Sequence, residues 1–247
     1  MIRNKNYSFL ETFGLKKGLK QFGDKGYDAA FGEIKQLHDR VAFQPIHINE
    51  MTQLEKKRAM ESLIFLVEKR DGRVKARTCA NGSTQRDYIS KEDAASPTAA
   101  TESILITATV EAKENRDVMS ADIPHASFQT DVDYNGTERM MMKIRGPLVD
   151  MLITLDLELY SEYVVYERGE KVIYVLLLKA LYGTLVAALL FYKKLRKDLD
   201  SMGFKINPYD SCVTNCVVKG KQHTVTWHSD DLKSSHVDPI VNIDFLR

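Results

Sequence analysis

Apolar residues recurring at helical spacing, or a capping signal, predict helices in three parts of the chain. Between Asp24 and Arg40 they follow each other at steps of three and four, which is typical of one face of an α-helix. A second helix is expected from Thr52 to about Ser62, because Thr52 and Glu55 form a capping box. A third stripe follows Gly183 and ends at Met202, where Gly203 is well placed to end a helix.

Other segments alternate with period two and are separated by turn residues. Asp71-Gly72 lies between two such segments, Leu63–Glu68 and Arg73–Arg77, and predicts a hairpin. Further hairpins are expected around Arg168-Gly169-Glu170 and around Lys219-Gly220-Lys221. The strands expected beside these two turns are Tyr163–Glu167 with Lys171–Leu178, and Cys212–Val218 with Gln222–His228.

Three remaining segments complete the expected fold. Ala99–Ala112 is rich in Ala, Thr and Leu and predicts a helix capped near Thr98. Val118–Phe128 predicts a strand that breaks at Pro124, and Ser229-Asp230-Asp231 is expected to turn into a strand over Leu232–His236. Hairpins mixed with helices indicate an α+β fold.

The run from Ile173 to Tyr192 has the length of a membrane span. Lys179 lies near its middle, where insertion would cost about 2.5–3.5 kcal/mol, and Gly183 interrupts it. A buried strand, a turn and a core-facing helix are therefore expected, and no membrane partner.

Composition narrows the class of protein. The 247 residues carry a net charge of +1, so the whole chain makes no strong electrostatic case for nucleic acid. The charge is unevenly spread, with ten basic and five acidic residues in 51–91 and two basic and four acidic residues from Trp227 onward. Three cysteines are too few for a disulfide framework, and no secretory signal begins the chain. We therefore expect an intracellular protein, cytoplasmic or nuclear, that is not secreted and has no disulfide partner.

The sharpest local feature is the pair Asp230-Asp231 at a turn between two apolar strands. Such a pair is either a polar hairpin tip or a site where a cation neutralises two repelling acids. Asp122, at the end of the expected strand over Val118–Ile123, supplies a third carboxylate. Three carboxylates suit a pair of Mg²⁺ or Mn²⁺ ions about 3.5–4 Å apart.

Three motifs in order carry a resemblance to a known family. They are Asp-Ile-Pro-x-Ala-x-x-Gln-Thr-Asp (Asp122–Asp131), Leu-Leu-Lys-Ala-Leu-Tyr-Gly-Thr (Leu177–Thr184) and His-x-Asp-Asp-Leu-Lys-x-Ser-His (His228–His236). Together they resemble the reverse transcriptases of Ty1/copia retrotransposons, and Asp71–Arg77 resembles that family's fingers hairpin. The likeness extends over roughly Thr52 to Val237.

The resemblance implies an RNA-directed DNA polymerase with right-hand architecture. It implies a helical lead-in or linker over 1–50, fingers over 51–115 and a partial palm over 116–247, whose antiparallel sheet carries packed helices. The partners would be an RNA or DNA template-primer and deoxynucleoside triphosphates, and the cofactors two Mg²⁺ or Mn²⁺ ions.

The resemblance also assigns roles to individual residues. Asp122 and Asp230 would ligate both metals, completed by Asp231 and the carbonyl of Ile123. The remaining nucleotide-binding positions would be Lys75 and Arg77 over the triphosphate, Ser127 at the sugar, and Tyr182 and Gly183 near the template base and nucleotide. Without the resemblance, Lys75 and Arg77 would be interpreted as a solvated hairpin face.

The chain departs from the family pattern at several positions. Ser127 stands where the family usually has an aromatic residue, which predicts weaker sugar discrimination, and His125 stands where a small residue is normal. Ser229 replaces a usual valine, and Leu185–Ala188 replaces polar or basic residues. The chain ends soon after Asp231, so we expect a truncated domain that lacks the thumb and grips a duplex weakly.

Two alternative functions stay open. One is a non-catalytic nucleic-acid-binding remnant of such a polymerase. The other is a small zinc-binding module built from Cys212, Cys216, His223 and His228. Against zinc, His223 and His228 are five residues apart on an expected strand and would point to opposite faces.

Overall fold

The chain folds into two compact units, each assembled from two separated stretches. The computed structural model describes residues 11–123, 130–132, 134 and 138–246. Unit 1 comprises Met1–Ile89 and Asp131–Leu185, and unit 2 comprises Ser90–Thr130 and Val186–Arg247. The domains expected from the sequence were three consecutive ranges, 1–50, 51–115 and 116–247, whereas each unit combines two separated ranges. The names fingers and palm stay predictions.

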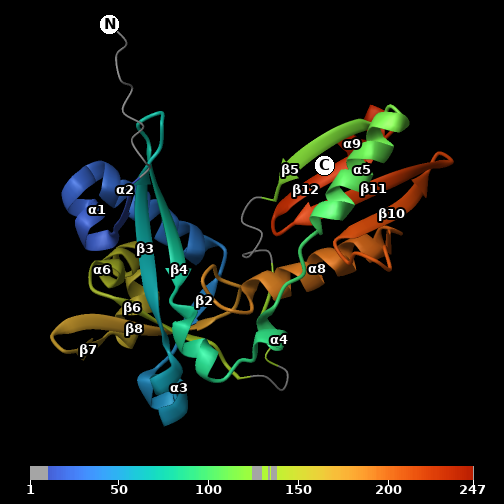
Figure 1. The fold of residues 1–247 in the computed structure, drawn as a ribbon. Coiled ribbons are helices and arrows are strands. Elements are labelled where there is room, and N and C mark those ends of the chain that lie inside the picture. Colours follow the sequence, from blue (N-terminus) through green and yellow to red (C-terminus); the bar gives the residue numbers. More distant parts are fainter. Residues whose placement is uncertain (1–10, 124–129, 133, 135–137, 247) are drawn as a thin grey trace, which may run out of the picture. The chain divides into compact units, whose positions relative to one another are not determined.

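Unit 1 is built on a mixed sheet with strand order β1-β3-β6-β8-β2, to which β4 and β7 add through β3 and β8 (Figure 1). Its strands are β1 (Thr12–Gly14), β2 (Phe43–Pro45), β3 (Met60–Glu68), β4 (Val74–Ala80), β6 (Met141–Arg145), β7 (Val165–Glu167) and β8 (Glu170–Leu177). Its helices are α1 (Leu15–Phe22), α2 (Asp24–Asp39), α3 (Gln53–Arg58), α6 (Pro147–Leu155) and α7 (Leu157–Tyr160), with 3₁₀ turns η1 (Ile48–Glu50), η2 (Gly82–Asp87) and η4 (Ser161–Tyr163).

The core of unit 1 follows the predicted apolar stripes. Ile34 and Leu37 of α2 are buried, as are Leu66 of β3 and Ile173 and Val175 of β8. The helix expected over Asp24–Arg40 is therefore confirmed, as are the β3–β4 and β7–β8 hairpins.

The predicted extent of the Thr52 helix is wrong. Thr52 does form the capping box with Glu55, but α3 ends at Arg58. Ala59 is extended and β3 begins at Met60, because this stretch pairs with β6 and then with β4. Strand pairing thus ends the helix four residues before Ser62.

Unit 2 is an antiparallel sheet of order β5-β12-β11-β10-β9 with helices on both faces (Figure 1). Its strands are β5 (Asp117–Asp122), β9 (Lys205–Ile206), β10 (Val213–Val218), β11 (Lys221–His228) and β12 (Asp231–His236). Its helices are α4 (Lys91–Ala94), α5 (Thr101–Lys113), α8 (Ala187–Ser201) and α9 (Pro239–Phe245).

The two faces of this sheet differ in chemistry. On one face, Phe191 and Leu195 of α8 join a hydrophobic cluster with Val225, Trp227 and Leu232. On the other face, the Lys233 ammonium reaches α5, where it donates to Thr107 Oγ1 at 2.9 Å and pairs with Glu111 at 2.9 Å. One face is therefore an apolar core, and the other is a polar layer under α5.

Three boundaries in unit 2 refine the sequence predictions. α5 begins at Thr101, and its first turn is held by Asp210, whose carboxylate accepts from the Ala100 N–H, instead of by a cap at Thr98. β5 ends at Asp122, and Pro124 lies outside the described residues. The helix predicted after Gly183 is confirmed as α8, and Gly203 follows it with a positive φ of 87°.

The membrane-length run over Ile173–Tyr192 forms β8, a turn and the first part of α8, as predicted. Among the described residues, no helix has both the length and the apolar character needed to cross a bilayer.

Candidate active site

Asp122 and Asp231 lie opposite each other at one end of the unit 2 sheet. β5 and β12 are antiparallel neighbours, and their register makes the Cα of Asp122 the partner of the Cα of Asp231. The next strand continues the row, because Asp231 is also the partner of His228 on β11. Directly paired residues present their side chains on the same face of a sheet, with Cβ atoms about 4.5–5.5 Å apart. Two acids distant in sequence therefore lie on the same face at the same end of the sheet, and both are exposed.

Asp230 occupies the turn between β11 and β12. Ser229 takes a positive φ of 56°, which sharpens this turn. The carbonyl oxygen of Asp230 accepts a hydrogen bond from the Ile123 N–H at 3.1 Å, so the turn is tied to the end of β5. This bond holds the chain around Asp122 against the Asp-Asp turn. The Ile123 side chain packs on the hydrophobic cluster around Trp227.

The three carboxylates do not converge into a complete metal cluster. Among the described residues, no group of three or more His, Cys, Asp or Glu side chains is placed to hold a metal ion. Asp122 and Asp231 share a face through the strand register, whereas Asp230 is adjacent to Asp231 along the chain. Like charges repel, so carboxylates come together most readily around a cation that neutralises them. The donor chemistry, exposed carboxylate oxygens at one sheet end, suits a hard divalent cation.

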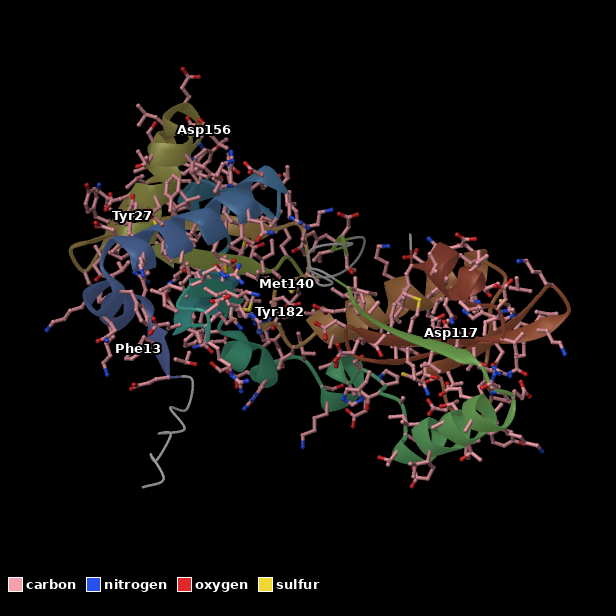
Figure 2. The ribbon with its side chains drawn as sticks, turned by 90° about the horizontal axis from the view of Figure 1, so that it is seen from above. Phe13, Tyr27, Asp117, Met140, Asp156 and Tyr182 are labelled. Atoms are coloured by element: carbon pink, nitrogen blue, oxygen red, sulfur yellow. The ribbon has the colours of Figure 1, made fainter. Side chains whose placement is uncertain are left out.

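The four described nucleotide-binding candidates outside the acid cluster lie together in unit 1. Lys75 and Arg77 are both exposed on β4. The Arg77 guanidinium lies 5.4 Å from the centroid of the Tyr182 ring, which is labelled in Figure 2. This distance suits a cation–π contact. The hairpin and the Tyr182-Gly183 motif, about 100 residues apart in sequence, thus lie in contact.

A close backbone approach holds Tyr182 and Gly183 against the end of β4. The Ala80 N–H donates to the Tyr182 carbonyl at 2.7 Å, and the Gly82 N–H donates to the Gly183 carbonyl at 3.2 Å. Gly183 has a φ of 88°, and a Cβ atom there would lie 2.1 Å from the Ala80 carbonyl oxygen. Glycine is required here both by the positive φ and by the close approach of the Ala80 carbonyl.

The site residues are thus divided between the units. Asp122, Ile123, Asp230 and Asp231 belong to unit 2, and Lys75, Arg77, Tyr182 and Gly183 belong to unit 1. Each group therefore lies within one unit, although the three carboxylates of unit 2 do not converge on one point. Ser127 and His125 lie outside the described residues.

A groove beside the acids contains residues that the sequence analysis did not single out. It has a volume of 360 Å³ and lies between Ile104 of α5 and the sheet face that carries Asp122, Thr226 and Asp231. Thr226 is only 4% exposed, and within the described part of the chain its hydroxyl has no hydrogen-bond partner. The alternation of threonines over His223–Thr226 was a signal that this strand carries a polar face.

The zinc-binding alternative gains no geometric support. His223 is buried, and its Nε2 lies 2.7 Å from Ser234 Oγ, whereas His228 is exposed. The predicted placement of these two histidines on opposite faces of a strand is consistent with their positions on β11. The absence of any metal-holding group among the described residues applies to these side chains as well.

Comparison with known proteins adds no family assignment. The chain matches no protein-family model and no curated protein sequence.

Proposed function

We propose that this chain is a reverse transcriptase domain of the Ty1/copia retrotransposon type, an RNA-directed DNA polymerase. The observation that supports the proposal best is the register of β5 and β12, in which Asp122 lies opposite Asp231 beside the Asp-Asp turn. The motifs that carry the resemblance are far apart in sequence. A polymerase site requires their acids close together, and the β5–β12 register is consistent with that requirement for Asp122 and Asp231.

In the proposed reaction, a primer 3′ hydroxyl attacks the α-phosphate of a deoxynucleoside triphosphate. A new P–O bond forms as the bond to pyrophosphate breaks, and the hydroxyl proton is lost to solvent. Asp122, Asp230 and Asp231, with the Ile123 carbonyl, would hold two Mg²⁺ or Mn²⁺ ions. When bound, such ions activate the attacking oxygen and steady the leaving oxygen.

The basic residues of unit 1 would bind the triphosphate. Lys75 and Arg77 offer ammonium and guanidinium donors on an exposed strand face. The contact of Arg77 with the Tyr182 ring would orient the guanidinium, and Tyr182 and Gly183 would lie near the template base. Ser127, with little bulk to exclude a 2′-hydroxyl, would make the enzyme tolerant of ribonucleotides.

Primer extension on an RNA template, with Mg²⁺ or Mn²⁺, tests this function. The wild-type chain should incorporate deoxynucleotides, and Asp122→Asn, Asp230→Asn and Asp231→Asn should each lower the rate at least about 100-fold, since even outer-shell changes at metal sites cost 10–100-fold. Asp200→Asn, at an exposed acid on α8, is the matched control and should leave the rate unchanged.

The contrary outcome favours the alternative function. If a cooperatively folded wild-type chain incorporates nothing, the polymerase proposal fails. Salt-dependent binding of the same template-primer would then support a non-catalytic nucleic-acid-binding remnant.

A further inference from the structure

We propose that α5 is a dimerisation surface, on which a second copy of this chain packs its own α5 in antiparallel orientation. The proposal is independent of the polymerase function, because none of the residues that carry it belongs to the proposed metal or nucleotide site.

The first observation is that α5, which lies over one face of the unit 2 sheet (Figure 1), has large apolar residues on its outward side. Thr107 and Glu111 contact Lys233, so these two positions mark the side of α5 that faces the sheet. At about 100° per residue, Leu105 and Ile106 lie on the opposite side of the helix. They are 62% and 64% exposed. A surface helix normally presents polar residues to solvent, so this exposed pair indicates a surface for a partner.

The second observation is the order of residues along this outward side. One helical turn separates each step of the stripe, which begins with an acid, continues through the apolar pair and a threonine, and ends with a base. All five residues are exposed, and in order they are Glu102, Leu105, Ile106, Thr109 and Lys113. The stripe is therefore an apolar centre with a negative charge at one end and a positive charge at the other.

This order of charges selects a second copy of the chain as the partner. A two-fold axis perpendicular to α5 near its middle places Glu102 of each copy opposite Lys113 of the other. The same axis brings Ile106 opposite Thr109 of the second copy, so a large side chain meets a smaller one. A parallel arrangement would instead place like charges together. The antiparallel pair is thus self-complementary, as an isologous two-fold interface requires.

The size of the surface sets the expected affinity. α5 has 13 residues and is about 20 Å long, so a single helix pair buries less area than a standard protein interface. We therefore expect a reversible dimer with a dissociation constant on the order of 10–100 μM.

Sedimentation velocity of the full chain, at concentrations up to about 1 mM, tests the proposal. The wild-type chain should pass from monomer to dimer as its concentration rises. Ile106→Lys keeps a good helix former but places a charge in the apolar centre, and it should weaken dimerisation at least about tenfold. Ile243→Lys, the same change at an exposed isoleucine of α9, is the matched control and should dimerise as the wild type does.

Charge reversal tests the antiparallel orientation. Glu102→Lys and Lys113→Glu should each weaken dimerisation about tenfold, since each turns two attractive contacts of the dimer into repulsive ones. The variant with both changes has the net charge of the wild type and should dimerise as tightly. Unfolding curves of each variant confirm that the fold is kept.

Three results would overturn the proposal. The first is a wild-type chain that stays monomeric over the whole range, which would leave α5 to a contact within the chain or to a different partner. The second is equal dimerisation of Ile106→Lys and Ile243→Lys, which would place the interface elsewhere. The third is a set of single reversals without effect, or a double reversal that does not restore the dimer.

Discussion

Asp122 at the end of β5 and Asp231 at the start of β12 are direct partners in an antiparallel register. Both side chains are exposed carboxylates on the same sheet face. Like charges in directly opposed strand positions destabilise a sheet. A cation or another ligand bound between the two carboxylates would offset this repulsion.

This relationship predicts a stability effect in the absence of divalent cations. Asp231→Asn removes one charge of the pair and should raise the free energy of unfolding by about 0.2–1 kcal/mol, measured by urea unfolding with EDTA present. Asp200→Asn, at an exposed acid on α8, should have no comparable effect. A lower free energy of unfolding for Asp231→Asn would mean that this carboxylate stabilises the fold, which contradicts the expected repulsion.

A second prediction concerns the backbone approach at Gly183. Gly183→Ala places a Cβ atom 2.1 Å from the Ala80 carbonyl oxygen at a φ of 88°. Gly72→Ala is the matched control in the same unit, because Gly72 has a φ of 78° with open space around it. We expect a loss of about 1 kcal/mol for Gly72→Ala and about 3 kcal/mol or more for Gly183→Ala, measured by chemical unfolding. Equal losses would show that the close approach does not constrain the chain.

A third prediction concerns acid sensitivity of unit 2. Burial, with smaller contributions from His236 and Arg116, lowers the pKa of His223 to about 4. The neutral ring fits a chain of hydrogen bonds through Ser234 to Asn242, whose amide donates to Asp117, labelled in Figure 2. Because the folded state resists protonation, the stabilisation is present above pH 6.5 and is lost as the pH falls from 6.5 towards 4.

The expected decrease is about 3 kcal/mol in the free energy of unfolding over that interval. Urea unfolding at a series of pH values measures it. His223→Gln can keep a hydrogen bond to Ser234 but cannot titrate, so its stability should vary less between pH 6.5 and 4. The same slope in both proteins would refute the assignment to His223.

Local chemistry explains which elements could be predicted from the sequence. The β3–β4, β7–β8 and β10–β11 hairpins carry their own turn residues, and α2 and α8 carry regular apolar stripes. In contrast, β6 and α6 were not predicted. β6 pairs in parallel with β3 and antiparallel with β8, partners that are remote in sequence, so no nearby turn marks it.

The candidate site was predictable in part for the same reason. The Asp-Asp turn is visible as a local motif, but the pairing of β5 with β12 is a contact across more than one hundred residues. Only the family resemblance suggested it. The alternation of threonines marks the polar face of β11 in the sequence, but the unpartnered hydroxyl of Thr226 beside the groove is visible only in the folded structure.

Calorimetric titration of Mg²⁺ into the wild-type chain, Asp122→Asn, Asp231→Asn and Asp200→Asn tests the central claim most directly. Asp122 and Asp231 should act together as ligands, so each of their substitutions should weaken saturable Mg²⁺ binding at least about tenfold. Asp200→Asn should bind as the wild-type chain does. No saturable Mg²⁺ binding by the wild-type chain, or equal affinities in all four proteins, would contradict the assignment of this carboxylate pair as a metal site.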